Sequence, residues 1–314
     1  MKAISCKLFY IQPMHKLILL LSLILSSSLS FSQQKIDKKL SKKLIDLTQN
    51  FNGDVGIYVK NLRTGKIAVL NADTIFPTAS TIKIPIMCGV FSMLEKGELL
   101  YHQELIYRDS LLYAGEDILG SFKDGEKIAL SKVQMLSITT SDNTASLWLQ
   151  KLVGTENINN WLQENGFKNT RVNSRTPGRE SFQKLYGWGQ TTPREMATLL
   201  INIRNGKAVS AAASERMYRN LIRIYWDQEA LSQIPPYIQV ASKQGAVDRS
   251  RSEVVLVNAP HGDYAFCIIT KNQKDTSWES GNEGFKLIRD LSAMLWNHYE
   301  PKSTWKPAEG IERY

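Results

Sequence analysis

The sequence predicts an α/β (α+β) fold: an antiparallel sheet flanked by terminal helices, with an inserted all-helical lobe. A helix and a hairpin come first, a long helical block follows, and three strands and a closing helix end the pattern. The composition, 43% hydrophobic and 22% charged, is that of a globular protein. We expect a domain over residues 33–314. Its α/β lobe would comprise about 33–79 and 206–300, its helical lobe about 80–205 and its tail 301–314.

The first 32 residues have the features of an export signal. Basic residues up to Lys16 precede an apolar run over 17–29, and small residues at Ser30-Phe31-Ser32 suit a cleavage site. The run is short for a transmembrane helix, so an uncleaved anchor is the less favoured alternative. We expect export across the inner membrane to the periplasm or the exterior, with no stable membrane span after cleavage.

Charge and composition limit the partners. Residues 1–32 contain three lysines and no acids, so their removal lowers the formal charge from +9 to +6. This modest charge is not clustered, and we expect no nucleic-acid partner. It suits a small anionic substrate or an anionic envelope surface, although an ordinary solvated surface is the simpler interpretation. We expect a monomer that acts on a small molecule.

The cysteines after the signal are Cys88, in a predicted apolar helix, and Cys267, in a predicted apolar strand. We expect two buried free thiols, while a disulfide remains the alternative in an exported protein. Cysteine and histidine spacings typical of metal sites are missing from the sequence. We therefore expect no metal and no other cofactor.

Periodicity predicts the elements of the first two thirds of the chain. A helix over Lys35–Phe51 precedes two strands, Val55–Lys60 and Lys66–Asn71, which form a hairpin. A further helix extends from Ser80 to about Lys96, and residues 100–130 are loop-rich. Helices are then predicted over 131–139, 144–152, 156–164 and 193–203, with a capping box at the start of the first and a polar loop over 172–192.

The final third changes to strands. After Pro235-Pro236 the pattern predicts strands over Tyr237–Ser242, Val254–Val257 and Tyr264–Lys271. An amphipathic helix over Phe285–Tyr299 follows. Strands from both ends of the chain would therefore share one sheet, and the chemistry would lie where the two lobes meet.

The stretch Ser80-Thr81-Ile82-Lys83 places a serine three residues before a lysine at a predicted helix start. Residues three apart share a helical face, so the Lys83 amine can take the Ser80 proton once its pKa is lowered. The helix N-terminus adds backbone N–H groups beside the hydroxyl. An ordinary helix start with a solvated lysine is the alternative, because S-x-x-K occurs at Ser32, Ser80, Ser181 and Ser303.

Two further motifs single out Ser80. Ser141-Asp142-Asn143 lies in a predicted break between helices, and Lys243-Gln244-Gly245 follows at the end of a predicted strand. A Ser-His-Asp hydrolase is poorly supported, because the sequence has no G-x-S-x-G elbow and its later histidines lie in turns or chain ends. A serine nucleophile here would need a lysine as its base.

With these motifs the sequence resembles the class A β-lactamase family and the related penicillin-recognising serine enzymes, whose signature is S-x-x-K, S-D-N and K-T-G. The resemblance covers nearly all of the chain after the signal. It includes the flanking stretches Phe76–Lys83, Ser141–Ala145 and Thr191-Thr192-Pro193. It implies a β-lactamase/transpeptidase-like fold.

The resemblance also implies catalytic roles. Ser80 would be the acylated nucleophile, Lys83 its proton partner, and Ser141 the group that passes a proton to the leaving nitrogen. Asp142 would brace the turn. We further expect the charge of Lys243 to lower the pKa of Lys83 by repulsion.

Other residues would bind the substrate. Asn143 would bond to its amide side chain, and Lys243, next to Gly245, would place positive charge near its carboxylate. The backbone N–H groups of Ser80 and Ala246 would form an oxyanion hole. Arg251, or else Arg249, would add a second carboxylate contact. The substrate-binding set is thus Asn143, Lys243, Gly245, Ala246 and Arg251.

Two departures from the family pattern affect the mechanism. Gln244 replaces the usual small hydroxyl residue of the third motif. The deacylating glutamate of the family lies in an R-x-E-x-x-x-N loop, but here Glu180 is the only carboxylate between Arg175 and Pro193, and its register differs. Glu180 is a candidate base for deacylation, and a solvated loop glutamate is the alternative.

The favoured hypothesis is an exported serine β-lactamase that hydrolyses the lactam amide through an acyl-serine intermediate. The first alternative is a penicillin-binding D,D-peptidase-like or esterase-like hydrolase with slow deacylation, acting on a β-lactam or a related acyl-amide. The second is a non-catalytic envelope binding module that has kept the fold.

Overall fold

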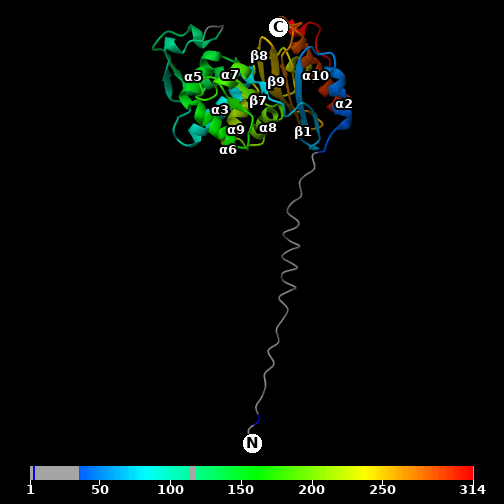
Figure 1. Cartoon of the computed structure of the whole chain (residues 1–314), viewed down its shortest axis with the longest axis horizontal. Helices are drawn as coiled ribbons and strands as arrows, with labels where there is room; N and C mark the ends of the chain where they lie inside the picture. Colours follow the sequence, from blue (N-terminus) through cyan, green and yellow to red (C-terminus); the bar gives the residue numbers. More distant parts are fainter. Residues whose placement is uncertain (1–2, 4–34, 114–116, 314) are drawn as a thin grey trace. The chain divides into compact units, whose positions relative to one another are not determined.

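The computed structural model describes residue 3 and residues 35–113 and 117–313, so the predicted export signal lies outside the described residues. A five-stranded antiparallel sheet has the strand order β2-β1-β10-β9-β8. Its strands are β1 (Asp54–Asn61), β2 (Ile67–Leu70), β8 (Val240–Val247), β9 (Ser250–Val257) and β10 (Tyr264–Lys271). β1 pairs with β10, so distant parts of the chain share one sheet, as predicted (Figure 1).

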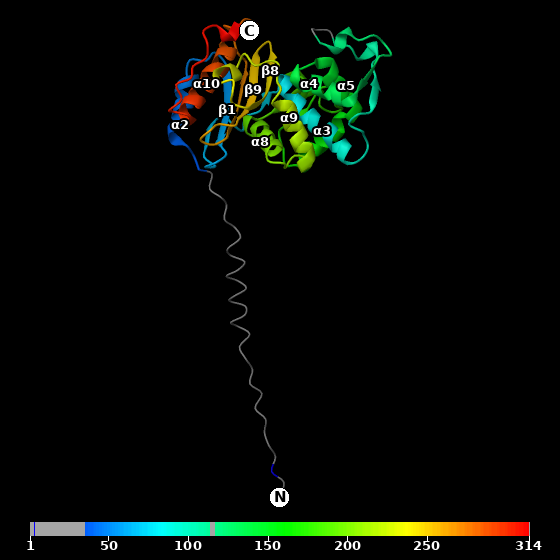
Figure 2. The ribbon, with the colours of Figure 1, turned by 180° about the vertical axis from the view of Figure 1, so that it is seen from behind.

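Helices cover both faces of this sheet. In Figures 1 and 2, α2 (Lys38–Thr48) and α10 (Glu283–Tyr299) lie on one side, and the other helices gather on the opposite side. That second group contains α3 (Lys83–Glu95), α4 (Leu130–Thr139), α5 (Asn143–Val153), α6 (Thr155–Glu164), α7 (Glu180–Tyr186), α8 (Pro193–Arg204) and α9 (Ala211–Leu221). The predicted fold class is therefore confirmed.

Each face of the sheet has its own core because successive strand side chains point to opposite faces. In β1, Ile57 and Val59 pack with residues of α2 and α10, whereas Tyr58 packs toward the other helices. All eight residues of β9 are buried, as expected for a strand that is covered on both faces.

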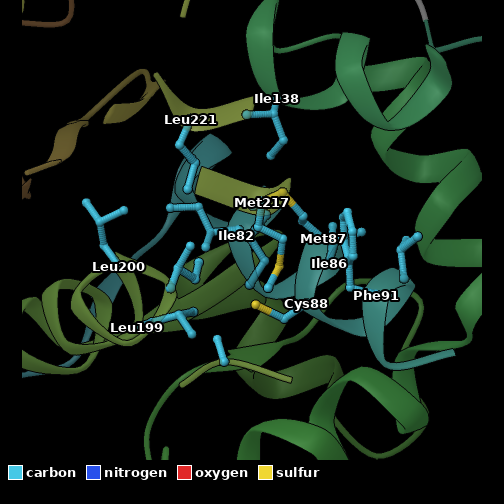
Figure 3. Packing of buried hydrophobic residues seen from close by; sticks show 14 of the residues in the cluster. Ile82, Ile86, Met87, Cys88, Phe91, Ile138, Leu199, Leu200, Met217 and Leu221 are labelled. Carbon is cyan, nitrogen blue, oxygen red and sulfur yellow. The ribbon is translucent and has the colours of Figure 1, made fainter. Parts of the chain in front are cut away.

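Helix α3 lies at the centre of the larger core. Its first nine residues are all buried, so its apolar composition is not confined to one stripe. Figure 3 shows Met87 and Cys88 of α3 packed with Leu199 of α8 and Met217 of α9. Cys88 and Cys267 are both buried free thiols, as predicted.

Several elements differ from the prediction. β8 begins at Val240 and continues to Val247, so Lys243 lies within the strand rather than at its end. Helix α9 was not predicted. The predicted capping box is wrong, because α4 begins at Leu130 with Ala129 as its N-cap and no side-chain cap.

Regions predicted as loops contain short elements. The stretch 172–192 holds α7 and most of a small sheet of β3 (Phe76–Pro77), β7 (Gly189–Thr191) and β6 (Arg171–Val172). The stretch 100–130 holds a hairpin of β4 (Glu104–Ile106) and β5 (Lys127–Ala129), and single 3₁₀ turns at Asp109–Leu111 and Leu119–Ser121. Within the described ranges, none of the helices combines the length and apolarity needed to cross a membrane.

Glu253 of β9 gives the fold a predicted pH dependence. Its carboxylate is buried and accepts hydrogen bonds from Ser242 Oγ (2.5 Å) and Ala230 N (3.0 Å), and burial raises its pKa to about 7. The folded state therefore holds this proton more tightly than the unfolded chain does, and stability falls as pH rises between about 4.5 and 7.

We expect Glu253→Gln to flatten the pH dependence of the free energy of unfolding between pH 5 and 8. At pH 8 the variant should be more stable than the wild type by roughly 1–3 kcal/mol, because no buried charge has to form. Urea unfolding at several pH values measures this. The matched control Glu279→Gln changes an exposed carboxylate and should leave the curve unchanged. An unchanged pH dependence in Glu253→Gln would refute the prediction.

Candidate active site

Ser80 lies in a rigid turn at the start of α3. It belongs to the 3₁₀ turn Ala79–Ile82, and the preceding Ala79 has a φ of 45°. A positive φ is strained for a residue with a side chain and persists only where the surroundings enforce it. Here Thr78 N donates to Gly189 O (3.0 Å), which ties the turn to β7. The half-buried Ser80 is thus presented from a fixed backbone.

Two buried lysines converge on the hydroxyl of Ser141. Lys83 Nζ donates to Ser141 Oγ (3.1 Å), to Ser141 O and to Asn143 Oδ1 (2.8 Å). Lys243 Nζ donates to the same Oγ (3.0 Å) and to Gln244 Oε1 (2.7 Å) and O (3.0 Å). Both lysines are fully buried. Ser141, with a φ of 59°, therefore links the two amines through one hydroxyl.

Burial makes both amines easier to deprotonate. It lowers the pKa of Lys83 to about 7, against the opposing effects of Asp117 and Asp142. It also lowers the pKa of Lys243, and repulsion from Lys83 adds to that shift. The predicted lowering for Lys83 is present, and burial is its largest cause; the mutual repulsion of the two ammonium groups works in the same direction. Near neutral pH the Lys83 amine can therefore accept a proton.

The Lys83 amine does not yet engage Ser80. Among the described residues, its hydrogen bonds go to Ser141 and Asn143. Catalytic hydrogen bonds often tighten only when substrate is bound, so this geometry is compatible with proton transfer from Ser80. The chain from Lys83 through Ser141 to Lys243 offers a route for that proton.

Gln244, at the position where the third motif usually has a small hydroxyl residue, contacts Lys243 directly. Its side-chain oxygen accepts from Lys243 Nζ, and the residue lines the same cavity as Ser80. Gln244 therefore both contacts the Lys243 amine and forms part of the wall of the cavity that holds Ser80.

Asp142 holds the turn that presents Ser141. It is the N-cap of α5, where Oδ1 accepts from Ala145 N (2.7 Å), and its Oδ2 accepts from Leu119 N (2.9 Å). The side chain is buried, and burial raises its pKa. The carboxylate joins the start of α5 to the 3₁₀ turn at residues 119–121, consistent with the expected bracing role.

Gly245 lets the edge strand approach Ser80. β8 is an outer strand of the sheet, and a Cβ atom built at Gly245 would lie 2.8 Å from Ser80 N and 2.9 Å from Thr78 O. A side chain there would push the strand away, so this position requires glycine. Ala246, the second expected oxyanion residue, follows immediately.

Two cavities meet at Ser80 and share this residue with Asn143 and Ala246. One, of about 710 Å³, extends toward Tyr113, Leu185–Trp188 and Arg249. The other, of about 700 Å³, also contains Ser141, Gln244 and Gly245 and extends toward Trp226 and Trp278. Together they form a cleft, open on both sides of Ser80, for a small molecule.

Two sequence-predicted residues are not brought to this cleft. Glu180 is exposed at the start of α7, where its Oε1 accepts from Gly178 N (3.1 Å), and it lines neither cavity. Arg251 is fully buried with its guanidinium between the rings of Trp278 and Phe285, 4.6 and 4.5 Å from their centroids. It donates to backbone carbonyls, including Ser277 O (2.6 Å), and lines neither cavity.

Trp188 is a site residue that sequence reasoning missed. Its ring centroid lies 5.5 Å from Lys83 Nζ, and its Nε1 donates to Gln150 Oε1 (2.5 Å). The buried Gln150 also donates to Ser174 O (3.0 Å), so it ties α5 to the loop before β7. The only sequence signal was the nearness of Trp188 to Thr191-Thr192-Pro193. Within the described ranges, His, Cys, Asp and Glu form no cluster that could hold a metal.

The two bonds of Asp142 give a stability test with matched variants. Asp142→Asn keeps an oxygen that can cap α5 but loses the acceptor for Leu119 N, whereas Asp142→Ala loses both. We expect losses of about 1 kcal/mol for Asn and about 2–3 kcal/mol for Ala in the free energy of unfolding. Chemical denaturation measures both. Equal stabilities of the two variants would contradict this division of roles.

Known proteins that are similar to this chain in sequence or fold include a β-lactamase and PBP-A. Beta-lactamase VEB-1 from Pseudomonas aeruginosa is 26% identical over 301 residues, which cover 90% of this chain and 98% of that protein. Structures of PBP-A superpose with a TM-score of 0.76 at 26% identity, over 85% of this chain and 98% of PBP-A, and one of them is an acyl-enzyme complex of a variant with penicillin G.

The fold has a further match in a β-lactamase from Sphaerobacter thermophilus, with a TM-score of 0.75 at 23% identity over 84% of this chain and 98% of that one. The sequence model of the beta-lactamase enzyme family matches residues 39–299, which include all three motifs. Because this family model matches well over half of the chain, the chain belongs to the beta-lactamase enzyme family.

Proposed function

We propose that this protein is a serine hydrolase whose Ser80 is acylated by β-lactams or related acyl-amides. The observation that carries the proposal is the buried Lys83, which follows Ser80 by three residues, has a pKa lowered to about 7 and contacts Ser141 through its amine. Family membership and the acyl-enzyme complex of PBP-A support the same chemistry.

Acylation would proceed through the residues of the cleft. Neutral Lys83 accepts the proton of Ser80 as the oxygen attacks the carbonyl carbon, and the N–H groups of Ser80 and Ala246 stabilise the oxyanion. The C–N bond then breaks, and Ser141 donates a proton to the leaving nitrogen. The lysines on either side of the Ser141 hydroxyl replace that proton. Asn143 binds the amide side chain of the substrate.

The rate of deacylation distinguishes a penicillin-binding enzyme from a β-lactamase. Hydrolysis of the acyl-enzyme needs a base that positions water, and Glu180 is exposed outside both cavities. The ring centroid of Trp188, which follows the loop of Glu180 in the sequence, lies 5.5 Å from Lys83 Nζ. These observations favour a penicillin-binding enzyme with slow deacylation. A β-lactamase with rapid turnover is the second candidate, favoured by the extended likeness to VEB-1.

Intact-mass spectrometry with benzylpenicillin tests acylation and deacylation together. We expect a lasting adduct on the mature protein and a nitrocefin turnover far below the roughly 10 s⁻¹ typical of enzymes. Ser80→Ala should give neither. The matched control Ser181→Ala alters another S-x-x-K serine, in exposed α7, and should label normally. Rapid turnover without an adduct would establish the β-lactamase version, and a protein that neither labels nor turns over would contradict acylation altogether.

The lowered pKa of Lys83 predicts how acylation depends on pH. Below about pH 7 the amine is protonated and cannot act as a base, so the second-order rate of acylation should fall about tenfold per pH unit and level off above pH 7. Lys83→Arg keeps a cation but no base and should lose at least about 100-fold. Rapid-mixing measurements from pH 5 to 9 give the profile. A rate independent of pH over this range would exclude Lys83 as the base.

A further inference from the structure

The chain beyond residue 299 lies outside the family match and folds back toward the cleft. Glu300 anchors it, because its carboxylate accepts from His261 N (2.9 Å) and contacts His261 Nδ1 (2.5 Å). Ser303 Oγ then accepts from Trp296 Nε1 (3.2 Å). In both views the red C-terminal segment lies near α10, at the same end of the sheet as the labels of β8 and β9 (Figures 1 and 2).

Apolar residues seat this segment. Trp305, Pro307 and Ile311 line one cavity together with Leu231 and Pro235, which precede β8. Trp305 and Ile311 are half-buried, whereas Lys306 is exposed. The segment is therefore packed against the body of the protein along the approach to β8, the strand that carries Lys243 and Gly245.

A tight turn directs the end of the segment into the active-site cleft. Gly310 is buried with a φ of 79°, and Arg313 N donates to Gly310 O (3.1 Å) in the 3₁₀ turn Ile311–Arg313. A Cβ at Gly310 would lie 3.2 Å from guanidinium atoms of Arg313, so the side chain folds across this glycine. Glu312 and Arg313 line the cavity that also holds Ser80.

Arg313 brings a positive charge to this cavity, whereas Arg249 and Lys271 line the other cavity beside Ser80. Of the described residues that line this cavity, it is the only lysine or arginine. Arg251 is held among backbone carbonyls and aromatic rings, and the pKa of the fully buried Lys243 is lowered. A guanidinium stays charged at every relevant pH and presents a fork of donors that matches a carboxylate. The exposed rings of Trp226 and Trp278 supply apolar walls nearby.

We propose that the segment Trp305–Arg313 is part of the substrate cleft and that Arg313 is a specificity-determining residue that binds the carboxylate of an anionic substrate. The proposal rests on the proposed function, because it places this carboxylate in the cavity that holds Ser80. The neighbouring Glu312 acts in the opposite direction, since its negative charge weakens anion binding at the same wall.

The binding of reversible boronic acids tests the carboxylate contact of Arg313 separately from catalytic turnover. In the adduct Ser80 Oγ bonds to the trigonal boron, which becomes tetrahedral without losing a group, and the serine proton passes to Lys83. Phenylboronic acid reports this bond alone, and 3-carboxyphenylboronic acid adds one carboxylate. Calorimetry gives the affinity of each compound, and their ratio isolates the carboxylate contact in a way that does not depend on deacylation.

We expect the wild type to bind the carboxylated compound about tenfold more tightly. Arg313→Ala should reduce this ratio to about one while phenylboronic acid binds as before, Arg313→Lys should keep part of it, and Glu312→Gln should increase it. The matched control Lys306→Ala removes an exposed cation of the same segment and should leave the ratio unchanged.

Two results would overturn the proposal. They also distinguish a failure of the Arg313 proposal from a failure of the proposed function. If phenylboronic acid binds and Arg313→Ala leaves the ratio unchanged, Arg313 does not bind the carboxylate, and the acylation chemistry stands. If neither compound binds the wild type, or if both bind Ser80→Ala equally well, Ser80 is not a reactive nucleophile, and both proposals fail.

Discussion

The hydroxyl of Ser141, held between two buried lysine amines, is the interaction on which the site depends. A buried ammonium group is costly unless hydrogen-bond acceptors surround it, and here serine, asparagine and glutamine oxygens provide them. Burial also lowers both pKa values, so a charged side chain becomes a base that works near neutral pH. Burial would destabilise the fold if the lysine had no chemical role. In Lys83 the same burial lowers the pKa of the amine and so suits it for proton transfer.

The fold brings together the three elements that this arrangement requires. Lys83 comes from the start of α3, Ser141 from the turn before α5 and Lys243 from the middle of an edge strand. The antiparallel pairing of β1 with β10 joins strands from before and after the inserted helices into one sheet, and the large core around α3 fixes the positions of these helices. At the contact itself the missing side chain of Gly245 lets the strand backbone reach the nucleophile turn.

Sequence patterns predicted the elements that have strong local periodicity. The hairpin, α8 and α10 follow from alternating or helical apolar spacing, whereas α3 and β10 were recognised from their continuous apolar composition. Helix α9 was missed because few of its residues are strongly apolar, although its N-cap Ser210 and the helical spacing of the buried Ala213, Met217 and Leu221 are local signals for it. The predicted bounds of β8 were wrong because the strand that pairs with β9 includes Lys243 and Gln244, and these residues have little tendency to form strands.

By itself, the sequence determined the fold class and identified the residues at the centre of the candidate site. It could do so because the residues of each motif are only a few positions apart, and the geometry over so short a stretch is known. Only the tertiary structure decided the surroundings: Glu180 lies outside the cleft, Arg251 is buried between aromatic rings, Trp188 covers Lys83 and Arg313 lines the cavity. The physical reason is that the direction and burial of these side chains depend on packing between segments far apart in the chain, for which short-range periodicity carries no signal.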